Sequence, residues 1–261
     1  MKILVNGIGG FMGREVAKLC EAGYRGASLG IGVDVSADGS DACCVASLSE
    51  VKNAREIDCV VDFSHHSCAP ALLEFCKKNG LAAVVATTGH TEVEVAAIHA
   101  AAESIPVFFS ANMSLGVALL LELAKTTAAA LPEAEIEIIE KHHDRKLDAP
   151  SGTALMLANA ICEVRPDAYP KTGRSGQGKR TCEEIGIHAI RMGNIVGEHE
   201  VIVGTPNQTI TLKHEAHSRA LFAEGALAAA SFVCRMAPGL YDMKSLVGGE
   251  KKDAALSGAH A

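Results

Sequence analysis

Three features are absent from this 261-residue sequence, and each absence excludes a class of protein. Positive charge is not in excess: the formal net charge of −7 argues against a nucleic-acid or anionic-membrane surface as the main partner. No apolar run approaches the ~18 residues that a membrane helix needs. The nine cysteines include no CxxC pair and no ligand-like cluster, which indicates reduced thiols in a cytoplasmic protein. The chain opens directly into a strand pattern, so we expect no signal peptide.

The composition that remains is that of a globular protein with room for two domains. Hydrophobic residues make up 48% of the chain and charged residues 21%, which is typical of a folded, soluble protein. A chain of 261 residues exceeds one typical domain and can bury a substantial core. A small anionic ligand would need a local basic pocket in this acidic chain.

The first part of the chain alternates short apolar strands with helical segments. The predicted strands are 2–6, 27–33, 57–63, 81–86 and 105–109. The helices predicted between them are 14–21, 68–79 and 92–104. Repeated βα units indicate a Rossmann-like, doubly wound parallel sheet, whose ligands bind at the carboxyl ends of the strands.

A glycine-rich turn joins the first strand to the first helix. Gly7, Gly10 and Gly13 form a variant of the dinucleotide-binding fingerprint in the required strand–turn–helix context. Glycines let the backbone approach the phosphates, and the helix N-terminus supplies N–H donors. Asp34 ends the second strand, where a carboxylate can accept hydrogen bonds from the adenine ribose hydroxyls. The pattern therefore predicts a dinucleotide cofactor.

The pattern changes after residue 113. A long apolar helix is predicted at 114–130, and the later strands follow one another without helices between them, which indicates an antiparallel or mixed sheet. Those strands are 185–191, 199–203 and 209–214, after an earlier one at 135–140. Residues 167–180 are predicted to be a long loop, and 219–235 a helix. We expect a dinucleotide-binding domain at 1–113, completed by 217–261, and an α+β substrate-binding and oligomerisation domain at 114–216.

The most distinctive stretch is Glu140 to Ala154. It places two histidines, two lysines and an arginine directly ahead of a predicted helix, with Ser151 or Thr153 as its N-cap. The N–H groups of the first turn form an anion site beside this cationic cluster. A dianionic substrate would find two anchors here, with proton donors that can titrate near neutrality. The alternative interpretation is a solvated charged loop ahead of a capped helix.

The stretch from Glu140 to Ala154 resembles the signature of the 4-hydroxy-tetrahydrodipicolinate reductase (dihydrodipicolinate reductase) family. The further matching segments are 7–13, 62–64, 87–89, 110–117, 187–191, 193–199 and 218–219. The resemblance implies reduction of 4-hydroxy-tetrahydrodipicolinate, a small cyclic dicarboxylate, to tetrahydrodipicolinate in diaminopimelate and lysine biosynthesis. The hydride would come from NAD(P)H. It also implies a cytoplasmic homotetramer assembled through the sheet of the substrate domain.

The resemblance also implies a role for individual residues. His142 corresponds to the family's catalytic histidine and Lys146 to its proton-donating lysine. The implied substrate-binding residues are His143, Ser151, Gly152 and Thr153. The implied cofactor-binding residues are Gly7, Ile8, Gly9, Gly10, Phe11, Met12, Asp34, Ala86, Thr87, Thr88, Ser110, Ala111, Asn112 and Met113.

Three residues depart from the family pattern. The family often has basic residues where this chain has Phe11 and Val35, so positive charge is missing where the 2′-phosphate of NADPH would sit. We therefore expect NADH to be preferred and NADPH to be accepted. Ala86 replaces a common glycine and adds one methyl group beside the nicotinamide approach.

Three other interpretations fit these residues less well. Another two-domain NAD-dependent dehydrogenase of a small anionic substrate should carry its own catalytic residues in place of the paired histidines. A non-catalytic nucleotide-sensing protein would not need His142 and Lys146. A metal site at His142, His143 and Asp144 is disfavoured, because adjacent side chains in an extended chain point apart and no HxxxH or HExxH pair is present.

Overall fold

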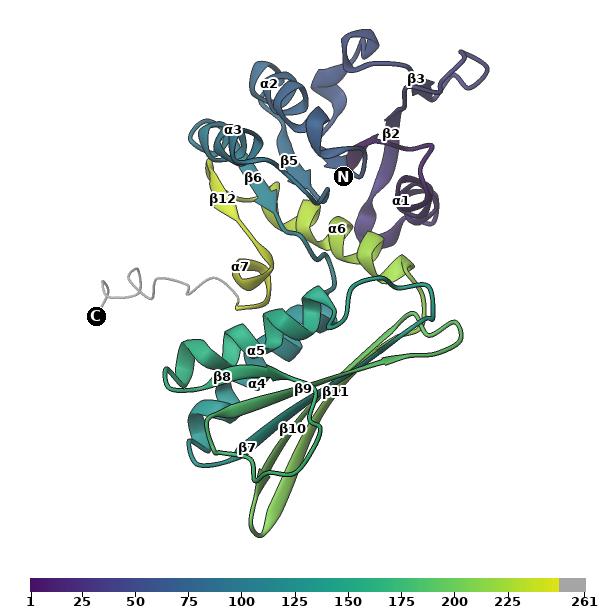
Figure 1. Cartoon of the computed structure of the whole chain (residues 1–261). Coiled ribbons are helices and arrows are strands. Elements are labelled where there is room, and N and C mark those ends of the chain that lie inside the picture. The colour runs from purple at the N-terminus through teal and green to yellow at the C-terminus, as the bar shows by residue number, and fades with distance from the viewer. Residues whose placement is uncertain (249–261) are drawn as a thin grey trace, which may run out of the picture. The chain divides into compact units, whose positions relative to one another are not determined.

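The structure, a computed structural model, describes residues 1–248, which form two compact units (Figure 1). Unit 1 comprises Met1–Leu115 together with the chain from Ala220 onward, and unit 2 comprises Gly116–Arg219. Residues 249–261, which belong to the segment expected to complete the first domain, lie outside the described residues. Among residues 1–248, no helix combines the length and the apolar character needed to cross a bilayer.

Unit 1 is built on a seven-stranded sheet in which every pair of neighbours is parallel. In spatial order the strands are β12 (Gly239–Tyr241), β6 (Pro106–Phe109), β5 (Ala82–Val85), β4 (Cys59–Asp62), β1 (Lys2–Asn6), β2 (Ser28–Val33) and β3 (Cys44–Val45). The strand order reverses its direction between β1 and β4, which is the point where ligands of doubly wound sheets bind. The predicted Rossmann-like sheet is confirmed, and the short edge strands β3 and β12 are additions to it.

Helices cover both faces of this sheet. They are α1 (Phe11–Glu21), α2 (Ala69–Asn79), α3 (Glu92–Ala102), α6 (Ala220–Val233) and α7 (Met243–Val247), with short 3₁₀ turns at Tyr24–Gly26, Leu48–Glu50, Ala54–Glu56 and His66–Cys68. Helix α1 packs beside α6, and α2 beside α3. Successive residues of a strand face opposite sides. Accordingly, Val107 packs into the cluster formed with α2 and α3, whereas the ring of Phe108 contacts Phe232 of α6.

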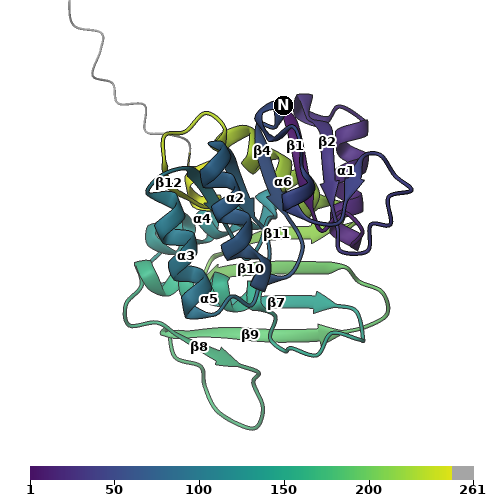
Figure 2. The same cartoon turned by 90° about the horizontal axis from the view of Figure 1, so that it is seen from above.

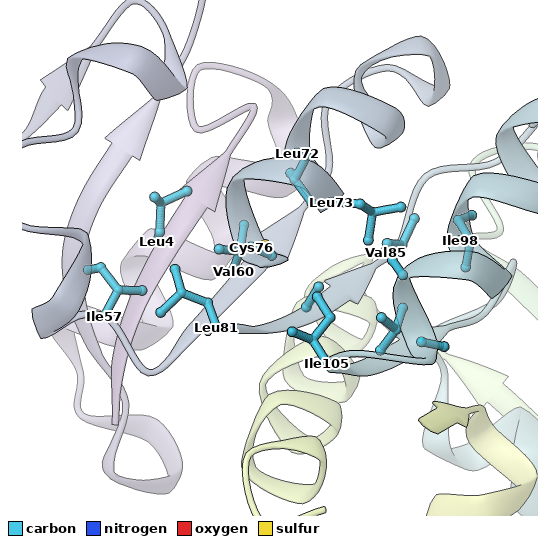
Figure 3. Packing of buried hydrophobic residues seen from close by; sticks show 14 of the residues in the cluster. Leu4, Ile57, Val60, Leu72, Leu73, Cys76, Leu81, Val85, Ile98 and Ile105 are labelled. Carbon is cyan, nitrogen blue, oxygen red and sulfur yellow. The ribbon is translucent and has the colours of Figure 1, made fainter. Parts of the chain in front are cut away.

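The core between the sheet and helices α2 and α3 is made of aliphatic side chains (Figure 3). Leu4 of β1, Val60 of β4 and Val85 of β5 belong to one buried cluster with Leu72 of α2 and Ile98 of α3. All five side chains are fully buried. A parallel sheet covered on both faces requires continuous apolar strands, which explains why these strands are recognisable in the sequence.

Unit 2 is built on a mixed five-stranded sheet (Figure 2). In spatial order the strands are β11 (Gln208–Ala216), β10 (Gly197–Thr205), β7 (Glu135–His142), β9 (Glu184–Arg191) and β8 (Tyr169–Thr172). Strand β10 is antiparallel to β11 and β7, whereas β7, β9 and β8 are parallel. This confirms the predicted mixed sheet. The prediction of a loop over 167–180 is wrong at its beginning, because β8 lies there. This strand is short, is at the sheet edge and contains Pro170, so it carries no clear strand pattern.

Helices α4 (Leu115–Ala130) and α5 (Gly152–Val164) cover one face of this sheet. Their buried residues pack on alternate residues of β7, beginning with Ile136 and Ile138. The same alternation places Glu140 and His142 on the buried face of β7. Packing of the hydrophobic core therefore carries two polar side chains into the interior beside the start of α5.

Replacing Leu157 by alanine should destabilise unit 2. Leu157 is fully buried in α5, so its truncation leaves a cavity and should lower the free energy of unfolding by about 2–5 kcal/mol. Leu155 lies in the same helix but is 39% exposed, and Leu155→Ala should cost about 0.5 kcal/mol or less. Urea unfolding followed by circular dichroism measures both changes, and equal losses would contradict the packing described here.

Candidate functional site

The glycine-rich turn of unit 1 fits a dinucleotide pyrophosphate. Gly7 has a φ of +81°, and a Cβ at this position would lie 2.8 Å from the backbone nitrogen of Ser64. Only glycine tolerates both conditions. Helix α1 begins directly after Gly10, which makes no side-chain capping bond, and its first turn contains no acidic residue. Its N–H groups and the helix dipole are therefore available to an anion.

Asp34 lies beside this turn. One carboxylate oxygen accepts a hydrogen bond from the Gly9 N–H at 2.8 Å, and the other accepts from the Ser36 hydroxyl at 2.6 Å. The Ser36 hydrogen bonds, followed by that of Gly9 and the nearby charge of Arg14, lower the pKa of Asp34 against the effect of burial. The carboxylate is thus ionised at neutral pH. The neighbouring Val35 side chain is 94% exposed and adds no charge.

The other expected cofactor residues follow β5 and β6, which are neighbours in the sheet. After β5, Thr87 is buried and its hydroxyl is 3.0 Å from Nε2 of His90, whereas Thr88 is exposed. After β6, the Ser110 hydroxyl donates to the carbonyl of Asn112 at 2.8 Å. The carboxyl ends of parallel strands share one edge, so these loops and the glycine turn lie along the same edge of unit 1.

A buried charge network lies at the end of β7 in unit 2. The carboxylate of Glu140 has no exposed surface and accepts two hydrogen bonds from Arg191, at 2.7 and 2.8 Å. It also accepts the Ser151 N–H at 3.0 Å and lies 2.5 Å from Nδ1 of His142. Burial alone would raise the pKa of Glu140, but the hydrogen bonds from Arg191, His142 and Ser151 outweigh it and lower the pKa. Glu140 is therefore an anion with both oxygens engaged.

His142 is held as a neutral imidazole. Burial lowers its pKa, and the opposing effect of Glu140 does not restore the usual value because Lys146 and Arg191 add to the lowering. An ionised carboxylate only accepts hydrogen bonds, so the proton of the imidazole is on Nδ1. The lone pair is consequently on Nε2.

His199 of β10 completes this buried group. Its ring contacts the His142 ring edge-on with centroids 5.2 Å apart, and its Nε2 is 3.1 Å from the Ser151 hydroxyl. Burial, followed by the neighbouring His142, lowers the pKa of His199 to about 4. His199 is thus uncharged at neutral pH.

The cationic cluster of the loop after β7 divides into separate pairs. The Lys146 ammonium is 2.7 Å from Asp148 and its side chain is 22% exposed. Arg145 is directed to Asp144 and Asn194, and Lys141 pairs with Glu198 at 2.9 Å. Lys146 therefore lies in the same loop region as His142 and His143. Lys141 and Arg145 are instead paired with other side chains.

The beginning of α5 is a second helix terminus that attracts an anion: the hydrogen bond from Lys146, together with one from the Gly152 N–H, lowers the pKa of Asp148. Ser151 is the N-cap and accepts a hydrogen bond from the Ala154 N–H at 3.3 Å, which decides between the two predicted caps. The first turn contains no acidic residue, and a Cβ added to the exposed Gly152 would meet no atom within 4 Å. Thr153 follows as a half-buried residue. Gly152 and Thr153 thus occupy the positions where first-turn N–H groups bind a carboxylate.

Three polar residues of this site were not predicted as site residues from the sequence: Glu140, Arg191 and His199. Glu140 could have been recognised, because it lies two residues before His142 in an alternating strand. The partnership with Arg191 depends on the register of β7 and β9, which no local pattern reveals. Among residues 1–248, no three His, Cys, Asp or Glu side chains are grouped to hold a metal ion.

The pKa of His199 should make stability depend on pH. Between pH 6.5 and about 4 the folded state binds fewer protons than the unfolded state, so stability present above pH 6.5 is lost as the pH falls. The loss should approach about 1.4 kcal/mol per pH unit for one histidine. Urea unfolding of His199→Gln should therefore show a shallower decline between pH 7 and 5 than the wild type. His99→Gln, at an exposed position, should keep the wild-type decline, and an identical decline in the His199 variant would refute the buried neutral state.

Comparisons with known proteins assign the chain to a family. A model for the N-terminus of dihydrodipicolinate reductase matches residues 1–113, and a model for its C-terminus matches residues 116–247. A 4-hydroxy-tetrahydrodipicolinate reductase of Caldanaerobacter subterraneus is 44% identical over 251 residues, covering 95% of this chain and 98% of the relative. One of Alkaliphilus oremlandii is 41% identical over 249 residues, with coverages of 95% and 98%.

Solved structures agree with the fold. A dipicolinate-bound dihydrodipicolinate reductase from Paenisporosarcina sp. TG-14 has a TM-score of 0.77 at 24% identity, covering 93% of this chain and 97% of that one. A diaminopimelate dehydrogenase of C. glutamicum has a TM-score of 0.58 at 14% identity, with coverages of 94% and 93%. Together with the matches to both halves of the chain, these findings show that the protein belongs to the dihydrodipicolinate reductase family, whose members are NAD(P)H-dependent oxidoreductases.

Proposed function

We propose that this protein reduces 4-hydroxy-tetrahydrodipicolinate to tetrahydrodipicolinate with NAD(P)H, in diaminopimelate and lysine biosynthesis. Membership of the family and the 44% identity to a relative of that name support the activity. The single observation that carries the site assignment is the combination in unit 2 of a neutral His142, the Lys146 ammonium and the N-terminus of α5, whose first turn contains no acidic residue. A substrate with two carboxylates and a reducible ring needs all three.

We propose further that residues 1–113 with 217–261 hold the cofactor and that 114–216 hold the substrate. The glycine turn and Asp34 support the first part of this division, since they suit a pyrophosphate and an adenine ribose. For the second part, Ser151 caps α5, and the N–H groups of Gly152 and Thr153 hold one substrate carboxylate. His143, in the same loop, holds the substrate from the side of Lys146.

The proposed chemistry divides between two catalytic residues. NADH, when bound, supplies the hydride. The 4-hydroxyl group of the substrate leaves as water, and addition of the hydride to the resulting conjugated imine leaves electron density on the ring, which must be stabilised and protonated. The Lys146 ammonium carries a proton to give, whereas the neutral imidazole of His142 presents a lone pair on Nε2 and can only accept. We therefore assign proton donation to Lys146 and orientation of the substrate, through a hydrogen bond accepted at Nε2, to His142.

We also propose a homotetramer in the cytoplasm. The face of the unit 2 sheet opposite α4 and α5 leaves three isoleucines incompletely buried, at Ile139, Ile190 and Ile202. Apolar side chains on an open sheet face are suited to burial against another copy of the chain. The unbridged state of all nine cysteines is in keeping with a reducing compartment.

Removal of either catalytic side chain should abolish most of the turnover. We expect Lys146→Ala and His142→Ala to lower kcat on the order of 10²-fold or more. The first loses charge stabilisation and the proton donor, and the second loses the group that orients the substrate. The dissociation constant of NADH should be nearly unchanged, since both residues belong to unit 2. Lys141→Ala is the matched control, because its ammonium is paired with Glu198, and it should keep kcat near that of the wild type. Wild-type turnover in the Lys146 or His142 variant would overturn the assignment.

The cofactor preference is proposed to be for NADH, with NADPH accepted. The ionised Asp34 would repel a 2′-phosphate, and neither Phe11 nor Val35 can neutralise it. Arg14 is the exception. Its positive charge contributes to the lowered pKa of Asp34, so it is the basic side chain that can pair with a 2′-phosphate beside that carboxylate.

The ratio of kcat/KM for NADH to that for NADPH, measured at low salt, tests this preference. We expect a ratio above one in the wild type. Val35→Arg should move the ratio toward NADPH by adding a bidentate partner for the phosphate, and Arg14→Gln should reduce the use of NADPH more than that of NADH. A wild-type preference for NADPH would show that Asp34 does not decide the choice.

A further inference from the structure

We propose that Glu140 is the positioning residue for His142: clamped by Arg191, its carboxylate holds the imidazole by Nδ1 so that Nε2 is presented to the substrate. This inference rests on the proposed role of His142 and adds the group through which the protein controls that role. Glu140 itself is fully buried and belongs to the interior of unit 2.

The carboxylate is fixed by four donors on two oxygens. Oε1 accepts from Nη2 of Arg191 at 2.7 Å and from the Ser151 N–H at 3.0 Å, and Oε2 accepts from Nη1 of Arg191 at 2.8 Å and from His142. A bidentate guanidinium defines the plane of a carboxylate as well as its position. The Glu140 carboxylate therefore cannot turn away from the imidazole without breaking the pair with Arg191.

The strand register explains why these groups meet. Glu140 and His142 are two residues apart on β7 and so face the same side of the sheet. Arg191 is directly opposite His142 on the parallel neighbour β9. Nη2 of Arg191 also donates to the carbonyl of Asp148 at 2.6 Å, and Asp148 pairs with Lys146. The guanidinium of Arg191 thus donates hydrogen bonds both to Glu140, which contacts His142, and to the loop that carries the proposed proton donor.

Gly197 lies beside Nε2 of His142, whereas Glu140 contacts Nδ1. A Cβ at Gly197 of β10 would lie 3.1 Å from Nε2, closer than nearly all contacts of real side chains. Gly197 does not have a positive φ, so its backbone does not require glycine. Glycine at this position therefore keeps the space beside Nε2 free of a side chain. Nε2 is the ring nitrogen that does not contact Glu140.

A purely structural ion pair between Glu140 and Arg191 is the competing explanation, and the titration of His142 separates the two. The charged and titratable groups facing His142 are Glu140 on its own strand, Arg191 on β9, Lys146 in the loop and His199 on β10. Glu140 is the group among them that favours the imidazolium. Loss of its charge must therefore lower the pKa of His142 further if the contact governs the ring.

The test is an NMR titration of the His142 ring nitrogens in the intact protein, with kcat measured in parallel. For Glu140→Gln we expect the His142 midpoint to fall by about one pH unit or more, and kcat to fall about tenfold or more. Glu140→Asp keeps the negative charge. Its His142 midpoint and its kcat should therefore both lie closer to the wild-type values than those of Glu140→Gln. Glu137→Gln is the matched control. Glu137 is also on β7, but its carboxylate contacts His188 of β9 at 2.9 Å, so the His142 midpoint should stay unchanged.

Two further variants make the outcome decisive. In a His142→Ala background, Glu140→Gln should cause no additional loss of kcat if it acts through the imidazole. If Glu140→Gln does not fold because Arg191 is left unpaired, Glu140→Gln with Arg191→Met removes both buried charges and should still show a lowered His142 midpoint.

An unchanged midpoint in a folded variant, or losses of kcat that multiply in the double variant, would overturn the inference about Glu140. Full turnover in His142→Ala would instead contradict the proposed role of His142 in turnover, on which this inference rests. In that case the NMR midpoint would still decide whether Glu140 controls the ring.

Discussion

A buried anion is the constraint on which the candidate site of unit 2 depends. The carboxylate of Glu140 has no contact with solvent, and such a charge is tolerated only where donors replace the water that it has lost. Its donors come from the end of β9, the end of β7 and the residue before α5. Satisfying one carboxylate therefore brings the end of β9, 51 residues away in the sequence, together with the end of β7 and the start of α5. The hydrogen bonds around the Glu140 carboxylate position the N-terminus of α5, His142 and the loop that carries Lys146.

Both units share one structural feature, a helix start without acidic residues beside the proposed site. In each, a helix begins with a first turn that contains no acidic residue, after Gly10 in unit 1 and after Ser151 in unit 2. What differs is the neighbouring charge. Unit 1 places the ionised Asp34 beside its helix, which suits the hydroxyls of a ribose. Unit 2 places Lys146 and neutral histidines beside its helix, which suits a carboxylate and a ring that must receive a proton. In the proposed function, cofactor selection and substrate chemistry are thus separated between the two units.

Much of this arrangement could be predicted from the sequence because its signals are local. The parallel strands are continuous apolar segments, the turn at Gly7 has its spacing, and Ser151 precedes a run of helix-forming residues. The exposed edge strand β8 was missed because Pro170 and polar neighbours give it no periodicity. The role of Glu140 was missed for a different reason. Its partner Arg191 is contributed by another strand, and strand register is determined by packing across the sheet rather than by adjacent residues.

The central claim is that this chain transfers hydride from a nicotinamide to a cyclic dicarboxylate. The most direct measurement follows the oxidation of NADH by absorbance, with the purified chain and substrate generated in place by the upstream synthase. We expect NADH to be consumed in equal amount to the substrate produced, and not at all when either the synthase or this chain is omitted. NADH that stays reduced in the complete mixture, together with a chain shown to be folded and to bind NADH, would contradict the account.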